Sequence, residues 1–222
     1  MSVPVITVDG PSGVGKGTVS QRLADLLGWH YLDSGALYRI LGYAAQQHAT
    51  DLDDGAALAK LAAALDIDFR DGAWLNGRYI EHEIRSEQAG ESASRVAHHR
   101  QVRAAMLDLQ RAFCKPPGLV ADGRDMGTTI FPDSPHKFYL TADAEERAKR
   151  RHKQLLENGL DGNIGALFRE IQQRDSRDMN RKDSPLRPAE DAHIIDTTHL
   201  GIEGVLEKVL DRLPYAVPAG PE

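Results

Sequence analysis

A glycine-rich segment near the amino terminus constrains the fold more than any other feature of the chain. It lies between an apolar run, Val3–Val8, and a segment with helical spacing, Lys16–Leu27. Glycines let backbone N–H groups converge on one point, where the helix N-terminus adds its positive end and Lys16 adds a full charge. This strand–loop–helix unit predicts a site for the phosphates of ATP. The residues of the predicted phosphate loop are Gly10, Pro11, Ser12, Gly13, Val14, Gly15, Lys16, Gly17 and Thr18.

The phosphate loop departs from its most common pattern at one position. That pattern has Ser or Thr directly after the lysine, whereas Gly17 stands there in this chain and the hydroxyl follows one residue later, at Thr18. We expect Thr18 to take part in holding a metal ion with the triphosphate. An ordinary glycine turn between strand and helix is the alternative, and it leaves the lysine at this spacing unexplained.

Apolar runs of strand length alternate with amphipathic helices along most of the chain. Apolar residues recur at helical spacing from Val19 to Leu27, and Gly28 follows as a stop signal. Strands separated by helices predict a doubly wound, five-stranded parallel α/β sheet with helices on both faces and ligands at the carboxyl ends of the strands. The expected strands are Val3–Val8, His30–Leu32, Gly118–Ala121, Lys137–Leu140 and Ala192–Ile195, with further helices at Gly35–His48 and Ile202–Leu213.

The pattern changes between residues 51 and 99. Two turn-forming pairs, Asp71-Gly72 and Asn76-Gly77, separate short alternating runs, which predicts a small antiparallel insert. We expect Trp74 and Tyr79 to pack within this insert rather than to stack on a base. Helices are predicted before and after it, at Leu58–Leu65 and from about Ser92 to Phe113.

Composition restricts the class of protein. The 222 residues carry a net charge of −6, which argues against a general nucleic-acid binder, and no apolar run is long enough to span a membrane. A single cysteine, Cys114, excludes an internal disulfide and fits a reducing compartment. The first residues lack the basic and apolar pattern of a secretory signal, so we expect none. We expect a cytoplasmic protein.

Asp122-Gly-Arg124-Asp125 follows the third predicted strand. A strand that ends in an acid is where phosphate-loop proteins place the carboxylate of the Mg²⁺ shell, so we expect Asp122 to hold Mg²⁺ through water. Arg124 can clamp a phosphate, and Asp125 can accept a hydrogen bond from an exocyclic amine. A local ion pair in a turn is the alternative.

Ser34 and Arg39 follow the second predicted strand. Ser34 is a candidate ligand contact, with a helix cap as the alternative. An arginine in the first turns of a helix opposes the helix dipole, so Arg39 indicates an anionic ligand nearby.

Arg174, Asp178 and Arg181 share one face of a predicted helix. Pairs of this kind on a wet surface contribute only a few tenths of a kcal/mol, and that is the alternative interpretation. Arginines beside a phosphate loop can instead neutralise a phosphoryl group in transfer.

Three further arginines, Arg147, Arg150 and Arg151, form a basic face on the preceding helix, and a polar break follows at 158–163. Between Arg147 and Arg187 there are 11 Lys and Arg against 6 Asp and Glu, which suggests a local polyanion partner. Two basic helices around a glycine-containing break predict a lid over ATP, with Arg150 as an ATP contact. A solvated helix face is the alternative.

Four motifs together give the chain a family resemblance. Gly10-Pro-Ser-Gly-Val-Gly-Lys-Gly-Thr, Asp33-Ser-Gly-Ala-Leu-Tyr-Arg, Asp122-Gly-Arg-Asp-Met-Gly-Thr and Arg174-Asp-Ser-Arg-Asp-Met-Asn-Arg occur in the order found in bacterial cytidylate kinases, of the nucleoside-monophosphate kinase group. The chain resembles that family over nearly its whole length. Its Lys-Gly-Thr ending resembles the form that monophosphate kinases use.

The resemblance implies ATP-dependent phosphorylation of CMP and dCMP to CDP and dCDP, with Mg²⁺ as cofactor, by a monomer that has no nucleic-acid or membrane partner. It implies a core domain (1–34, 104–146 and 164–222), a monophosphate-binding domain with a β-hairpin insert (35–103) and a lid (147–163). Catalysis would depend on Lys16, Arg124, Arg174 and Arg181. The implied CMP contacts are Ser34, Arg39, Arg103, Arg124, Asp125, Arg174, Asp178 and Arg181, of which Arg103 follows from the resemblance alone.

Other functions stay open at this point. A kinase of the same class could act on UMP, AMP or a small hydroxyl metabolite. A phosphate-loop switch or regulatory ATPase would hydrolyse nucleotide without an acceptor, and the paired arginine segments argue against it. Nucleic-acid binding through residues 147–187 is disfavoured by the acidic remainder of the chain.

Overall fold

The computed structural model describes residues 3–69, 72–157 and 162–214. The chain forms two compact units. The first contains Met1–Leu32 and Phe113–Glu222, and the second contains Asp33–Ala112. The predicted lid at 147–163 and turn at 158–163 lie partly outside the described residues, as does Asp71. No helix in the described ranges has the length and apolar character needed to cross a bilayer.

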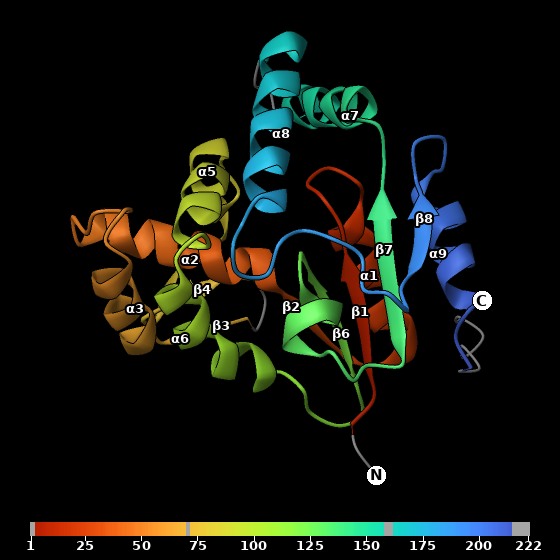
Figure 1. The fold of residues 1–222 in the computed structure, drawn as a ribbon, viewed down its shortest axis with the longest axis horizontal. Coiled ribbons are helices and arrows are strands. Elements are labelled where there is room, and N and C mark those ends of the chain that lie inside the picture. The colour runs from red at the N-terminus through yellow and green to blue at the C-terminus, as the bar shows by residue number, and fades with distance from the viewer. Residues whose placement is uncertain (1–2, 70–71, 158–161, 215–222) are drawn as a thin grey trace. The chain divides into compact units, whose positions relative to one another are not determined.

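A parallel sheet organises the first unit and confirms the predicted fold class (Figure 1). Its strand order is β2-β6-β1-β7-β8. β1 pairs in parallel with β6 and β7, and β7 pairs in parallel with β8, because the chain returns through a helix or a long connection before each of these strands. The strands are β1 (Val5–Asp9), β2 (His30–Asp33), β6 (Leu119–Gly123), β7 (His136–Thr141) and β8 (His193–Asp196).

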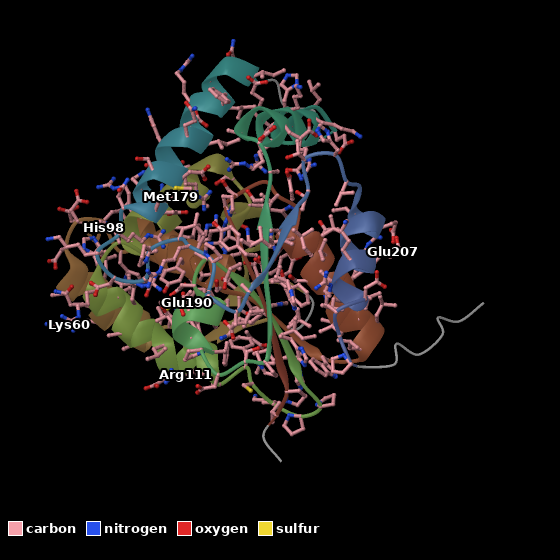
Figure 2. The ribbon with its side chains drawn as sticks, turned by 45° about the vertical axis from the view of Figure 1, so that its right-hand side comes forward. Lys60, His98, Arg111, Met179, Glu190 and Glu207 are labelled. Atoms are coloured by element: carbon pink, nitrogen blue, oxygen red, sulfur yellow. The ribbon has the colours of Figure 1, made fainter. Side chains whose placement is uncertain are left out.

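Two helices cover one face of this sheet. α1 (Lys16–Leu27) and α9 (Ile202–Leu210) pack on it through a core that includes Leu23, Phe138 and Val205. Glu207 lies on the solvent side of α9 (Figure 2). α1 has the predicted bounds because Gly28 ends it in the left-handed conformation at φ 65°. A π-helical turn, η1 (Met126–Ile130), follows β6 and contacts β1.

The basic helices α7 (Ala144–Glu157) and α8 (Ile164–Met179) pack against each other (Figure 1). Ala148, Leu167 and Ile171 form their buried contact. Ile164, the first residue of α8, does not take part in this contact, because its side chain is 45% exposed. The contact is small and apolar, with the partly buried Ala144, Leu155 and Phe168 packed against it.

The second unit contains the predicted antiparallel insert. Its three-stranded sheet has the order β3-β4-β5, and Asn76-Gly77 makes the β4–β5 turn with φ values of 50° and 76°. This is the left-handed turn that an Asn-Gly pair favours. Trp74 packs edge-on against Tyr79, as expected, with ring centroids 5.4 Å apart. The elements are α2 (Ser34–Gln47), α3 (Gly55–Ala64), β3 (Ile67–Asp68), β4 (Trp74–Leu75), β5 (Arg78–Tyr79), α4 (Glu81–Ile84), α5 (Glu87–Val96) and α6 (Arg100–Arg111).

The single helix predicted from Ser92 to Phe113 is wrong. The segment forms α5 and α6, and the chain turns between them near His98, which lies at the surface (Figure 2). α5 packs on α2, whereas α6 packs on α3. One straight helix cannot pack along two differently placed helices, so the helix is interrupted between α5 and α6. At that point the His99 ring forms a hydrogen bond of 2.8 Å with the carbonyl of Leu52.

Candidate functional site

The phosphate loop connects β1 to α1 through three glycines in backbone conformations that other residues rarely adopt. Gly10, Gly13 and Gly15 have φ values of 146°, 78° and 91°. A Cβ at Gly10 would lie 2.1 Å from the carbonyl oxygen of Leu140, so no other residue fits there. The path follows β1 directly and ends at the first turn of α1, at the carboxyl edge of the sheet.

Lys16 lies buried at the base of the loop. Its Nζ donates to the carbonyl oxygen of Pro11 at 2.8 Å and lies 4.0 Å from Oδ1 of Asp122. Burial, and then the positive charge of Arg124, lower the pKa of Lys16. A bound phosphate would favour the protonated ammonium, so the loop presents a cation that an anionic ligand stabilises.

Asp122 lies near the end of β6, beside Gly17. A Cβ at Gly17 would lie 3.5 Å from Oδ2 of Asp122, whereas the Thr18 side chain is exposed. Tyr31 donates its hydroxyl to the same oxygen at 3.3 Å. In the described part of the chain, no group of three or more His, Cys, Asp or Glu side chains could hold a metal. Mg²⁺ is commonly held by one or two carboxylates with substrate phosphates, and a buried carboxylate beside a phosphate loop fits that mode.

A buried arginine–carboxylate cluster lies in the same unit. Arg124 donates from Nε to Oδ2 of Asp178 at 3.0 Å, and Arg181 donates to Oδ1 of Asp178. Asp178 is only 1% exposed, although its neighbour Met179 projects into solvent at the end of α8 (Figure 2). Burial would raise the pKa of Asp178, but the charges of Arg124, Arg181 and Arg174 outweigh it and keep the carboxylate ionised.

This cluster differs from a set of surface ion pairs. It joins residues that are 54 positions apart, and both Asp178 and Arg181 are buried. A surface pair of that kind contributes little, whereas a charge buried with its partner depends strongly on it. The sheet brings Arg124 to the carboxyl end of β6, next to β1 and the phosphate loop that follows it.

Asp9 is a site residue that sequence reasoning missed. Its two carboxylate oxygens accept from the N–H groups of Met126 and Gly127, at 2.8 Å each. Burial raises the pKa of Asp9 to about 7, against the opposing effect of these two bonds. Asp9 therefore anchors the turn that carries Arg124 and the buried Asp125. An acid directly before the first glycine of the loop was the available signal.

Arg147 and Arg150 make different contacts from those expected of a solvated basic face. Arg147 is 4% exposed and donates to the carbonyl of Ser12 at 3.1 Å and to Asp175 at 2.5 Å. Arg150 donates to the carbonyl of Thr197 at 2.6 Å. The base of α7 is thereby tied to the phosphate loop and to α8, and the alternative of a solvated face is wrong for Arg147.

Three of the predicted CMP contacts belong to the second unit. Asp33, rather than Ser34, caps α2 by accepting from the N–H of Ala36 at 2.9 Å, so the alternative role of Ser34 as a cap is wrong. Arg39 donates to the carbonyl of Ile84 at 2.8 Å. The buried Arg103 lies over the ring of Tyr38, with 5.9 Å between its guanidinium carbon and the ring centroid.

The parallel sheet, the glycine-rich loop with its buried lysine and the acid at the end of β6 define a P-loop nucleotide-binding protein. The family model for cytidylate kinase matches residues 6–214. The chain belongs to the cytidylate kinase family.

Relatives cover nearly the full length of the chain. A cytidylate kinase of Shewanella loihica is 53% identical over 97% of this chain and 96% of its own length. Cytidylate kinases of Colwellia psychrerythraea and Stutzerimonas stutzeri are 54% and 53% identical, over 94% and 95% of this chain and 95% of each relative.

Proposed function

We propose that this protein is an ATP-dependent kinase that transfers the γ-phosphoryl group of ATP to CMP and dCMP, giving CDP and dCDP. One observation carries the proposal beyond the family assignment. The first unit holds a phosphate loop with a buried lysine and, after the neighbouring strand, a second buried cationic cluster formed by Arg124, Asp178 and Arg181. Two phosphate-binding features are what a kinase needs when its acceptor is itself a phosphate.

The proposed chemistry requires no strong general base. The acceptor oxygen of a nucleoside monophosphate is already anionic, so catalysis consists of positioning and charge neutralisation. Lys16 would neutralise the outer phosphates of ATP, and Arg124, Arg174 and Arg181 would act at the transferred group and the acceptor phosphate. Mg²⁺ bound with ATP would supply further charge neutralisation between the phosphates, with Asp122 as its carboxylate.

Base selection is assigned to carboxylates. Asp125 and Asp178 would accept from the exocyclic amine of cytosine, which uracil lacks. Both oxygens of Asp178 already accept from arginines, but a carboxylate offers about four acceptor positions, so room for a further donor remains. Ser34, Arg39 and Arg103 of the second unit complete the proposed CMP contacts, and Arg150 is the proposed ATP contact in the lid.

The remaining proposals concern organisation. We infer a core of residues 1–34, 104–146 and 164–222, a monophosphate-binding domain of residues 35–103 and a lid of residues 147–163. The lid would exclude water, which otherwise accepts the phosphoryl group. We further infer that the protein acts as a monomer in the cytoplasm.

The deciding experiment compares acceptors. ADP release is followed with CMP, dCMP, UMP and AMP, and without any acceptor. CMP and dCMP should support rapid release, and UMP should be much slower because it lacks the amine. Equal rates with UMP and CMP would overturn the assignment to cytidylate. Acceptor-independent hydrolysis at the same rate would indicate a regulatory ATPase instead.

A further inference from the structure

Gly17 leaves the phosphate loop without a side-chain hydroxyl at the position after Lys16. In the common loop a Ser or Thr at this position lies beside the acid that follows a neighbouring strand, and both serve the metal. Here a Cβ at Gly17 would be 3.5 Å from Oδ2 of Asp122, which is ordinary van der Waals contact. A serine hydroxyl at position 17, one bond further out, would therefore reach Oδ2. Gly17 removes that donor, while Asp122 keeps its place.

Tyr31 supplies a hydroxyl at the same point from another element. It lies on β2, and its hydroxyl donates to Oδ2 of Asp122 at 3.3 Å. The same hydroxyl would be 3.6 Å from a Cβ at Gly17. Gly17, Tyr31 and Asp122 thus meet around one carboxylate oxygen. The other oxygen, Oδ1, faces Nζ of Lys16 at 4.0 Å.

We infer that the Tyr31 hydroxyl, on β2, orients the carboxylate of Asp122 in place of the loop hydroxyl that Gly17 lacks. By its bond to Oδ2 it directs the other oxygen, Oδ1, toward Lys16 and the phosphates. Tyr31 is a positioning residue and touches neither phosphate nor metal. The inference rests on the proposed function, since it assumes that Asp122 serves Mg·ATP. A glycine at position 17 and a hydroxyl-bearing side chain at position 31 then form one functional pair.

If Tyr31 positions Asp122, loss of its hydroxyl should affect the binding of Mg·ATP more than the binding of metal-free ATP. Partners that orient a metal-serving carboxylate commonly change metal affinity by 10- to 100-fold when removed. The bond at 3.3 Å is long and Tyr31 is half-buried, so an effect of about tenfold is expected. The phosphate loop and Lys16 remain in place, so ATP without metal should bind almost as before.

The test is Tyr31→Phe, which removes the hydroxyl and keeps the ring. Affinities for ATP are measured calorimetrically on the full chain, once with Mg²⁺ and once with a chelator, in the absence of CMP. Tyr31→Phe should weaken Mg·ATP binding about tenfold and change metal-free ATP binding less than about twofold. An equal loss in both, or no loss in either, would overturn the inference.

Rescue distinguishes a positioned hydroxyl from general packing. In the Tyr31→Phe background, Gly17→Ser restores a hydroxyl that reaches Oδ2 from the loop, and Gly17→Ala adds the same Cβ without it. The serine variant should recover at least half of the lost binding free energy, and the alanine variant should recover none. Equal recovery by both would show that volume, and not the hydroxyl, is what matters.

The proposed function can fail separately. If the unsubstituted chain binds Mg·ATP but phosphorylates neither CMP nor dCMP, the proposed function fails and the binding comparison still decides the role of Tyr31. If it phosphorylates CMP and Tyr31→Phe shows no selective loss, only this inference fails. Melting temperatures of all four chains exclude unfolding as the cause.

Discussion

Buried charges dominate this protein at the scale of single residues. Lys16, Asp9 and Asp178 are all buried, and each has different partners. Lys16 donates to one backbone carbonyl, Asp9 accepts two backbone N–H groups, and Asp178 accepts from two arginines. Burial penalises each charge, so its protonation state depends on these partners and on ligands that bring opposite charge.

Lys16→Ala should reduce turnover severely while the fold is retained. The glycines still permit the path of the loop, although the bond from Lys16 to the carbonyl of Pro11 is lost. The outer phosphates lose the cation that neutralises their charge. A decrease in kcat of about 10²- to 10³-fold is expected by comparison with the loss of one donor that stabilises developing charge. Steady-state kinetics measure it, and circular dichroism checks the fold. Normal kcat in a folded variant would contradict the role assigned to Lys16.

Arg181→Ala should lower kcat as well as the affinity for CMP. The substitution removes a charge proposed to act on the acceptor phosphate, and it leaves Asp178 with one arginine fewer. An increase in KM alone would mean that Arg181 binds the ground state and the transition state equally. Lys182→Ala is the control, because Lys182 is adjacent in the chain and exposed.

Asp9 should make stability depend on pH in a distinctive direction. Because burial raises its pKa to about 7, the folded protein keeps a proton between about pH 4 and pH 7 that the unfolded chain has released. The free energy of unfolding should therefore fall as pH rises through this range, by up to about 4 kcal/mol for this one group. Above pH 7 the contribution is lost.

Urea unfolding of the unsubstituted chain and of Asp9→Asn, between pH 4.5 and pH 8, tests this dependence. The variant cannot titrate at this position. As pH rises, the free energy of unfolding of the unsubstituted chain should therefore fall relative to that of Asp9→Asn. The slope of that difference carries the result, because Asn also loses one of the two backbone acceptors. A difference that is flat with pH would contradict the raised pKa.

The helices α7 and α8 show how one side chain can fix an element. Arg147 connects α7 to the loop carbonyl of Ser12 and to Asp175 on α8. It also lies so close to the loop that a Cβ at Gly13 would be only 3.2 Å from the Cβ of Arg147. The apolar contact between the two helices is small. The position of α7 therefore depends on polar bonds as much as on packing.

Arg147→Met should destabilise the protein by about 3 kcal/mol, because it leaves the buried Asp175 without its cation. Lys153→Met on the same helix is the control, since the pair that Lys153 makes with Glu157 is exposed and the substitution should change stability by less than about 0.5 kcal/mol. Urea unfolding measures both. Equal stability of the two variants would show that Arg147 does not anchor the helix.

At the scale of the whole molecule, most elements of both units could be predicted from periodicity and turn residues. The five strands of the sheet, α1 with its glycine stop and the Asn76-Gly77 turn followed local rules that the structure confirms. The break between α5 and α6 could not be predicted in this way. It depends on which helix each half packs against, and that information is not local.

Part of the candidate site could likewise be predicted from the sequence, and part of it could not. Glycine spacing and a following lysine were enough to predict a phosphate loop, because the loop is one continuous segment whose backbone geometry demands those residues. Three other features depend on how distant segments fold together. They are the anchoring of η1 by Asp9, the burial of Arg147, and the contact of Tyr31 with Asp122, which is 91 positions away in the sequence. Strand order determines which distant residues become neighbours, and burial determines how strongly their charges interact. Neither the neighbours nor the burial can be derived from residues that are adjacent in sequence.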